Sequence, residues 1–319
     1  MNCSNHTQNH PDSAHQVILL LFTVPTFFIG SALNGAALYT ICCAIKQRTK
    51  PFIYMVNLVI SDTLLLFSLP FKVYAFYVKE DWILKMEKSF CQFLESLCFV
   101  NNYTSILVIT LICVDRYVAV RYPFNARTNS SPRTIAGICA FIWITVCICT
   151  INIYFKSQSK SCFYFISADV LRLEFIIPLG VLVLICALTM LFCSLHIIHS
   201  LNTRASETLD GCKDKCVKIL LSNLFTFLIC FTPYHTVLLL YSLAVNGSLS
   251  GHNCERLRLA LHCTLYLANV NCCLDAIYYF YAIKELRRSQ QIPDKKIQMD
   301  VCDTSVSSTV NQSRNSHSH

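Results

Sequence analysis

The sequence predicts an all-α membrane protein, in which a bundle of seven transmembrane helices precedes a short amphipathic eighth helix. Composition is the first observation, because 54% of the 319 residues are hydrophobic and only 14% are charged, against roughly 25% charged in soluble domains. The second is that the apolar residues form runs long enough to cross a bilayer, which takes about 20 residues of helix. The runs are continuous, so they exclude a transmembrane barrel, whose segments alternate over about ten residues.

These runs also give the domain organisation. We expect an extracellular N-terminus over 1–16, a transmembrane domain over 17–283, and an amphipathic helix with a disordered cytoplasmic tail over 284–319. The tail is rich in Ser and Thr and lacks the apolar residues that could build a core. The expected spans lie near residues 17–45, 52–78, 91–114, 134–154, 171–199, 217–245 and 257–283.

The second and third spans carry charges whose depths follow from the rise of a helix, whereas the first span carries none. The first 45 residues contain no Lys or Arg, so the first span should act as its own insertion signal. The second span places Asp62 near mid-depth and Lys72 roughly 15 Å further out, at about 1.5 Å per residue. On the third, Glu95 and Arg116 lie roughly 31 Å apart. Lys72 and Glu95 should therefore share the outer half of the membrane.

The remaining four spans are long apolar runs that contain few charged, proline or tryptophan residues. Trp143 lies in the fourth, Pro178 in the fifth and Pro233 in the sixth. The seventh carries Asp275, which can meet Asp62 in the middle of the membrane. Ionisable side chains within lipid are functional candidates by default, because burying them is costly.

The distribution of Lys and Arg predicts the orientation. Alternate connections hold 17 of the 26 basic residues on one side and 8 on the other, with Lys72 inside a span. Cytoplasmic loops retain positive charge, so the N-terminus should lie outside the cell. The net charge of +8 then follows from this bias and from anionic lipid, and it does not indicate nucleic-acid binding.

Outer segments carry candidate modifications. Asn2, Asn5 and Asn246 open N-glycosylation sequons on the predicted outer face. Of the 20 cysteines, four are expected outside, where disulfides form. These four allow three pairings, of which we favour Cys91 with Cys162 and Cys3 with Cys254. We expect no metal site from Cys and His, since Cys212 and Cys216 have no further ligands nearby.

Several short motifs occur in order, each in its appropriate span, and together they identify a resemblance. Over residues 17–290 the chain resembles the rhodopsin-like (class A) G-protein-coupled receptors. The motifs are Gly30-Ser31-Ala32-Leu33-Asn34, Asn57-Leu58-Val59-Ile60-Ser61-Asp62, Asp115-Arg116-Tyr117, Trp143, Cys230-Phe231-Thr232-Pro233 and Asp275-Ala276-Ile277-Tyr278-Tyr279.

The resemblance implies a two-state switch at the cytoplasmic end. Asp115 would hold Arg116 at rest, and activation would release Arg116 to contact a G protein as the sixth helix swings outward. Tyr117 and Tyr279 would belong to the same switch. The plainer alternative is a juxtamembrane ion pair without a switch.

Three positions depart from the family pattern. Phe231 replaces the usual tryptophan, and Cys186 stands where a tyrosine is common in the fifth helix. Asp275-Ala276 lacks the proline of the last-helix motif, which puts a bend there in doubt because proline is the usual cause of a kink.

The resemblance also implies a sodium pocket at mid-depth, the one possible cofactor site. Its oxygen ligands would offset two buried carboxylates in the resting receptor, and the alternative is a polar core without sodium. The implied residues are Asp62, Asn34, Ser105, Asn271 and Asp275.

The ligand class can be narrowed from particular positions. Cys98 stands seven residues after Cys91, where an amine receptor needs an acid, and residues 257–283 contain no Lys for a retinal Schiff base. Lys72, inside a span, instead favours an anionic group, which pairs strongly with a cation.

The nearest resemblance is to the orphan-like group of the lysophosphatidylinositol and kynurenic-acid receptors, on stretches such as Ser68-Leu69-Pro70-Phe71-Lys72 and Asn269-Val270-Asn271-Cys272-Cys273-Leu274-Asp275. It implies that Lys72 binds a phosphate or is held by Glu95. The implied pocket comprises Lys72, Glu95, Phe99, Asn102, Tyr103, Phe231, His235, Tyr241, His262 and Leu265.

We therefore expect a plasma-membrane receptor, not an enzyme, for an anionic lipid or small acid. Its expected partners are a heterotrimeric G protein of the G12/13 or Gi type and arrestin. An aryl carboxylate or a nucleotide is the alternative ligand. A more distant alternative is a multipass transporter that moves protons through Asp62, Asp275 and His235, and a membrane scaffold is a third.

Overall fold

The computed structural model describes residues 13–44, 49–78, 88–121, 131–155, 171–203, 219–248, 254–276, 278–279 and 283. All regular structure in these residues is helical, which confirms the predicted all-α class. The helices are α1 (Ser13–Ala44), α2 (Lys50–Val78), α4 (Lys88–Arg121), α6 (Pro132–Thr150), η2 (Ile151–Phe155), α7 (Leu173–Thr203), η4 (Phe227–Phe231), α9 (Thr232–Val245) and α10 (Cys254–Asn269). Residues 219–226 and 271–276 are helical as well.

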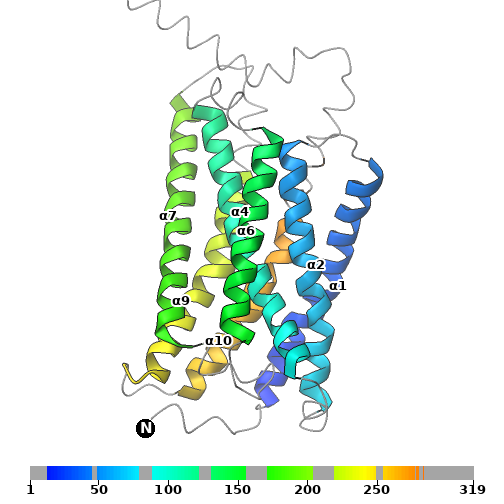
Figure 1. Ribbon diagram of the computed structural model, residues 1–319, viewed down its shortest axis with the longest axis vertical. Helices are drawn as coiled ribbons and strands as arrows, with labels where there is room; N and C mark the ends of the chain where they lie inside the picture. The colour runs from blue at the N-terminus through cyan, green and yellow to red at the C-terminus, as the bar shows by residue number, and fades with distance from the viewer. Residues whose placement is uncertain are drawn as a thin grey trace, which may run out of the picture.

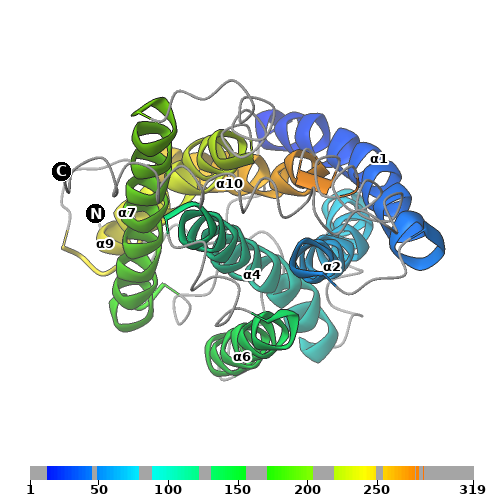
Figure 2. The same cartoon turned by 90° about the horizontal axis from the view of Figure 1, so that it is seen from above.

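The long helices run side by side as a bundle, with α4 in the middle (Figures 1 and 2). α4 packs against α2, α6 and α7, while α1 lies at the edge against α2 and α10. The apolar span within α4 is accordingly 78% buried, against 22% for the span within α1. We call the end at which α1 begins, at the bottom of Figure 1, the Lys72 end, and the opposite end the Asp115 end.

Six helices in the described residues are long and apolar enough to cross a membrane. They match the first six predicted spans. The seventh predicted span corresponds to α10 and to residues 271–276, but α10 is only 16 residues long and is interrupted at Val270. It is also more polar than the others, since it buries His262 and Asn269.

The exposed surface of the bundle is apolar, as expected for contact with lipid. Leu21, Phe28 and Phe141 are each about two-thirds exposed, while Asn34, Asp62 and many other polar side chains are buried. This arrangement suits a bilayer, in which the solvent is hydrocarbon and polar groups turn inward.

Local sequence explains the start of α6 and its attachment to the bundle. Ser131 caps the helix by accepting a hydrogen bond from the backbone N–H of Thr134 at 3.2 Å, and Pro132 occupies the first turn. Further along, the indole Nε1 of Trp143 donates to Asn57 Oδ1 at 2.9 Å. This bond fixes α6 against α2.

Pro233 explains the π-helical turn η4 that precedes α9. A proline inside a helix has no N–H and crowds the carbonyl four residues earlier, so the helix must widen or bend there. Here the backbone N–H of Thr232 bonds Phe227 O, five residues back. Residues 219–226, η4 and α9 therefore form one bent transmembrane element.

The last helix breaks at Val270, although no proline is present. Val270 N bonds Leu267 O at 3.1 Å and Cys273 N bonds Val270 O at 2.9 Å, so the spacing tightens to three residues. The missing proline had put a bend in this helix in doubt. The structure shows that the helix is interrupted nonetheless, at Val270 between the buried residues Asn269 and Asn271.

Candidate functional site

A buried polar network lies at the centre of the bundle, around Asp62. The Asp62 side chain is fully buried. Its Oδ1 accepts from Asn101 Nδ2 at 3.0 Å, and its Oδ2 accepts from the Tyr279 hydroxyl at 2.7 Å. α2, α4 and the last helix therefore meet at one carboxylate. Sequence reasoning missed Asn101, which is one of two adjacent asparagines on α4, and only the neighbouring Asn102 had been selected.

The same network contains several buried oxygen atoms that could serve as ligands of a hard cation. Asn34 Nδ2 donates to Gly30 O and to Cys272 O, each at 3.1 Å, which joins α1 to the last helix. Asp275 is buried and interacts electrostatically with Asp62. Among the described residues, several buried oxygens here have no hydrogen-bond partner: Asn34 Oδ1, Asn101 Oδ1, Ser105 Oγ, Asn271 Oδ1 and Asp275 Oδ2. Carboxylate, amide and hydroxyl oxygens are the ligands that hard cations prefer.

At the Asp115 end, Asp115 contacts two basic residues. Lys50 Nζ lies 3.1 Å from Asp115 Oδ1, whereas Arg116 Nη2 lies 4.0 Å from Asp115 Oδ2. The predicted Asp115–Arg116 pair is present, but the shorter bond belongs to Lys50. The second predicted span begins at residue 52, so Lys50 was expected in the connection before it. It instead begins α2, which brings its ammonium group to the end of α4.

The other predicted switch residues lie in two different places. Tyr117 packs edge-on against His196 of α7, with ring centroids 5.3 Å apart. Tyr279 is not at this end, since its hydroxyl bonds Asp62 in the middle of the bundle. Asp115, Arg116 and Tyr117 therefore lie at the Asp115 end, whereas Tyr279 lies in the middle of the bundle.

At the Lys72 end, Lys72 is buried beside aromatic side chains. It is only 4% exposed, and its ammonium group lies 4.8 Å from the centroid of the Tyr266 ring. Tyr266 OH bonds His15 Nε2 at 2.9 Å, and the His15 and His262 rings meet edge-on at 4.6 Å. We call Lys72, Tyr266, His15 and His262 the Lys72 cluster.

The charge of Lys72 has no salt-bridge partner in the described part of the chain, since no carboxylate there lies within 4.0 Å of it. Glu95 is described, and it does not form the predicted pair with Lys72. Sequence reasoning missed Tyr266 and His15. His15 stands before the first predicted span, and Tyr266 is one aromatic residue among many.

A second group of predicted pocket residues gathers around His235. Its Nε2 lies 3.2 Å from the Tyr103 hydroxyl and its Nδ1 lies 2.8 Å from Phe231 O. The Phe99 and Tyr103 rings pack at 4.3 Å, and Phe231 is fully buried beside Phe227. Both ring nitrogens of His235 are therefore engaged, as in a satisfied core histidine.

The remaining predicted pocket residues are more dispersed. Asn102 is buried in α4. Tyr241 packs on a separate apolar cluster that includes Leu171 and Leu261. Leu265 is half-buried on α10.

Comparison with known proteins identifies the family. The family model described as 7 transmembrane receptor (rhodopsin family) matches residues 33–279. The chain belongs to that family. Similar receptors include G-protein coupled receptor 35 from Homo sapiens, 33% identical over 276 residues that cover 83% of each chain.

Two other relatives are similar at comparable levels. G-protein coupled receptor 55 from Homo sapiens is 32% identical over 295 residues, which cover 89% of this chain and 91% of that receptor. Lysophosphatidic acid receptor 6 from Gallus gallus is 32% identical over 295 residues, which cover 83% of this chain and 91% of that receptor. These relatives are receptors and not enzymes, and they exclude the transporter alternative.

In this rhodopsin-family receptor, two of the four predicted outer cysteines are described. Cys91 and Cys254 are each disulfide-bonded, while their predicted partners Cys162 and Cys3 lie outside the described residues. So do Asn2, Asn5 and the predicted segment 284–319.

The third predicted glycosylation residue, Asn246, is described at the end of α9. Its Nδ2, the atom that would carry a glycan, donates to Leu171 O at 3.0 Å and to Ser242 O at 2.7 Å. The amide therefore has a structural role here, connecting α9 to Leu171 in the segment before α7.

Proposed function

We propose that this receptor is activated at the Lys72 end by an anionic lipid of the lysophosphatidylinositol type, and that it activates a G protein of the G12/13 or Gi class. The N-terminus and the Lys72 end face outside at the plasma membrane, so the Asp115 end meets the G protein. Arrestin would bind the same cytoplasmic side.

The observation that carries the proposal is the buried ammonium group of Lys72. Removing an ammonium group from water costs several kcal/mol, and a desolvated cation–π contact contributes about 2 kcal/mol. The Tyr266 ring therefore offsets only part of the cost. A phosphate or carboxylate beside Lys72 would supply the missing charge, and His15 and His262 could donate to it.

Two considerations favour a lipid. Relatives of this chain include receptors named for lysophosphatidic acid, a single-chain lipid with a phosphate group. The walls of the bundle near Lys72 are also apolar, as an acyl chain requires. The alternative is a planar small acid or a nucleotide, which the aromatic rings of Tyr266 and His262 could stack against.

The test is a panel of acidic lysophospholipids, aryl acids and nucleotides, applied to cells that express the receptor, with G-protein activation as the readout. The active compound is then measured on Lys72→Met and Lys72→Arg. A hydrogen bond between charged groups contributes about 1.5–3 kcal/mol, so Lys72→Met should lower potency about tenfold or more.

Lys72→Arg keeps the charge and should retain most of the response. Surface expression, measured on intact cells, distinguishes loss of binding from loss of folding. Unchanged potency in Lys72→Met at normal surface expression would remove Lys72 from the site, and activation by a planar acid alone would favour the small-acid alternative.

We also propose that a sodium ion binds at Asp62 and Asp275 in the resting receptor. Its ligands would be the buried oxygens around these carboxylates, and the ion would offset their mutual repulsion. Sodium should raise the melting temperature of the purified receptor relative to potassium, and Asp62→Asn should abolish that difference. An equal effect of both salts on the unmodified receptor would argue against the ion.

A further inference from the structure

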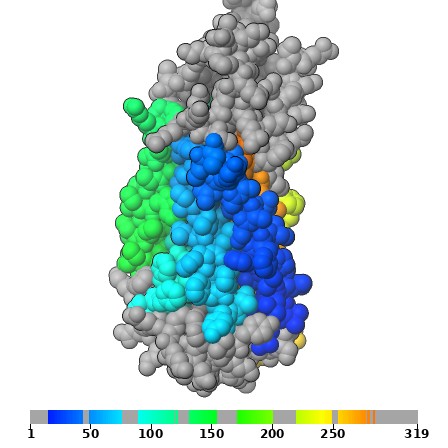
Figure 3. All heavy atoms as spheres, turned by 90° about the vertical axis from the view of Figure 1, so that its right-hand side faces the viewer, coloured from blue at the N-terminus to red at the C-terminus, as the bar shows by residue number. Residues whose placement is uncertain are grey.

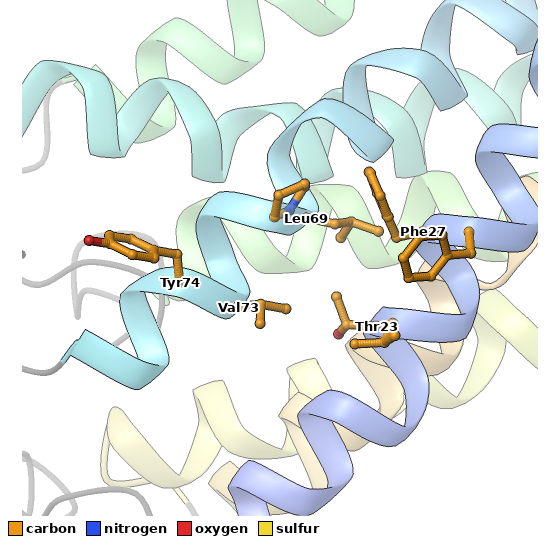
Figure 4. Close-up of a pocket in the computed structure, with 8 residues that line it drawn as sticks. Thr23, Phe27, Leu69, Val73 and Tyr74 are labelled. Carbon is orange, nitrogen blue, oxygen red and sulfur yellow. The ribbon is translucent and has the colours of Figure 1, made fainter.

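A cavity of about 470 Å³ lies between α1 and α2, towards the Lys72 end. Its residues form what we call the α1–α2 groove: Thr23, Val24, Phe27, Phe28, Leu69, Pro70, Val73 and Tyr74. Figure 3 shows the two helices side by side on one face of the molecule, and Figure 4 shows Thr23 and Val73 on opposite walls. The volume lies within the range of about 300–1,000 Å³ that small ligands occupy.

The sequence explains why the two helices separate here. Pro25 lies inside α1 and Pro70 lies inside α2, and each removes a backbone donor and bends its helix. Towards the Asp115 end the helices approach closely, since a Cβ on Gly30 would lie 2.8 Å from Leu66 Cδ2. The groove therefore opens just beyond a tight glycine contact, where both helices carry a proline.

The chemistry of the groove fits an occupant that comes from the bilayer. Phe28 is 66% exposed and Tyr74 is 48% exposed, so the groove opens on the lipid-facing surface. Its walls are almost entirely apolar. Thr23 is the exception, and its hydroxyl has no hydrogen-bond partner among the described residues, whereas Thr40 and Thr63 bond the carbonyl four residues back.

The groove and the Lys72 cluster are built on neighbouring stretches of α1 and α2. Leu69 and Val73 lie three residues before and one residue after Lys72 on α2. On α1, Leu19 is buried one turn before Thr23 and packs on Tyr266, the ring that Lys72 contacts. An apolar slot open to lipid therefore lies next to a buried cation that lacks a salt-bridge partner in the described residues.

We propose that the α1–α2 groove binds the acyl chain of a single-chain anionic lipid whose phosphate group is held by Lys72. This inference rests on the proposed function, and it assigns the part of the site that distinguishes a lipid from a small acid. Charge complementarity favours this occupant over a neutral sterol, which would fill the groove and leave Lys72 unpaired.

The first test fills the groove from α2 with Val73→Trp. The control is Val181→Trp on α7, where a valine that is 49% exposed lies outside the groove. The probes are lysophosphatidylinositol with a stearoyl chain and with a hexanoyl chain. Displacing several methylene groups should lower the potency of the stearoyl lipid about tenfold or more in Val73→Trp, with a smaller change for the hexanoyl lipid.

Val181→Trp should leave both potencies unchanged. Equal potency of the stearoyl lipid in Val73→Trp and the unmodified receptor, at equal surface expression, would overturn the proposal.

The second test needs no variant, so folding does not affect it. Stearoyl lysophosphatidylinositol with a diazirine near the end of its chain is photolysed on the unmodified receptor in membranes, and the labelled peptides are mapped by mass spectrometry. Label on residues 23–28 or 69–74, displaced by excess unlabelled lipid, supports the proposal. Label confined to α7 or α9 overturns it, as does labelling of the groove by a photoactivatable sterol but not by the lysophospholipid.

Activation by the lipid and binding of its acyl chain in the groove can be distinguished. If no acidic lysophospholipid activates the receptor, the proposed function is wrong, and so is the assignment of the lipid's acyl chain to the groove. If the lipid activates through Lys72 but labels another surface, only the assignment of the groove is wrong.

Discussion

Tyr279 places its hydroxyl 2.7 Å from Oδ2 of Asp62, a fully buried carboxylate. A donor to a buried charge is worth more than an ordinary hydrogen bond, because its loss leaves that charge less solvated. In the family resemblance this tyrosine belongs to the G-protein switch. In the structure it is part of the central network, which joins the last helix to α2.

Tyr279→Phe should lower the free energy of unfolding by about 1–3 kcal/mol, since it removes a single donor to a buried carboxylate. Tyr278→Phe is the matched control, because that hydroxyl lies 3.5 Å from its acceptor, Pro51 O, at the limit of a hydrogen bond. Thermal unfolding of the two purified variants measures the difference. Equal melting temperatures would mean that the Asp62 bond contributes nothing to stability.

Lys50 competes with Arg116 for Asp115. Lys50→Met should leave Asp115 free to pair with Arg116 alone, and this would favour the resting state and lower ligand-independent G-protein activation. The Lys50 side chain is 22% exposed, so we expect a change of about 1 kcal/mol, or roughly fivefold. Lys50→Arg is the control and should preserve basal signalling. Higher basal signalling in Lys50→Met would show that Lys50 restrains the receptor instead.

The sequence predicted individual polar residues better than their partners. Asp62, Lys72 and Asp115 could be selected because a charge inside an apolar run is costly and therefore has a purpose. Asn101, Lys50, Tyr266 and His15 were missed, because the folding of distant segments decides which neutral or terminal residue reaches a given charge. The resemblance implied that Lys72 binds a phosphate or is held by Glu95, and in the structure its ammonium group lies over Tyr266.

Helices α1 and α2 depend on a glycine for their close contact. A Cβ on Gly30 would lie 2.8 Å from Leu66 Cδ2 and 3.2 Å from Cys272 Sγ, whereas a Cβ on Gly35 would meet nothing within 4 Å. The close approach joins α1 to both α2 and the last helix. It also bounds the α1–α2 groove on the side that faces the Asp115 end.

Gly30→Val should therefore destabilise the receptor by about 1–3 kcal/mol, the usual cost of overpacking. Gly35→Val carries the same change in helix propensity without the clash, so it isolates the packing effect. Melting temperature and surface expression of the two variants provide the comparison. If Gly35→Val is as harmful as Gly30→Val, helix propensity and not packing explains the loss.

The first six spans were predictable because each is a long apolar run, and such a run has few alternatives to a transmembrane helix. The seventh was predicted as continuous over 257–283, but the structure breaks it at Val270. No proline lies at that interruption, and Asn269 and Asn271 beside it do not by themselves predict the end of a helix. Its cause lies in tertiary contacts, such as the bond from Asn34 to Cys272 O.

Across the whole bundle, α4 is the element that can connect the two ends. It is the central helix, contacts Asp62 through Asn101, and carries Asp115 and Arg116 near its C-terminal end (Figure 2). The bent element that contains η4 contacts both α4 and the last helix. A ligand at Lys72 can therefore shift the balance between two packings of these elements, provided that it binds one of them more tightly.

A distance measurement between two spin labels tests this coupling most directly. One label replaces Ala136 at the start of α6 and the other replaces Leu221 in the helix before η4, both exposed and near the Asp115 end. In the unmodified Lys72 background, stearoyl lysophosphatidylinositol should lengthen the distance between the labels, and in Lys72→Met it should leave that distance unchanged. The same lengthening in both backgrounds would contradict a signal that begins at Lys72.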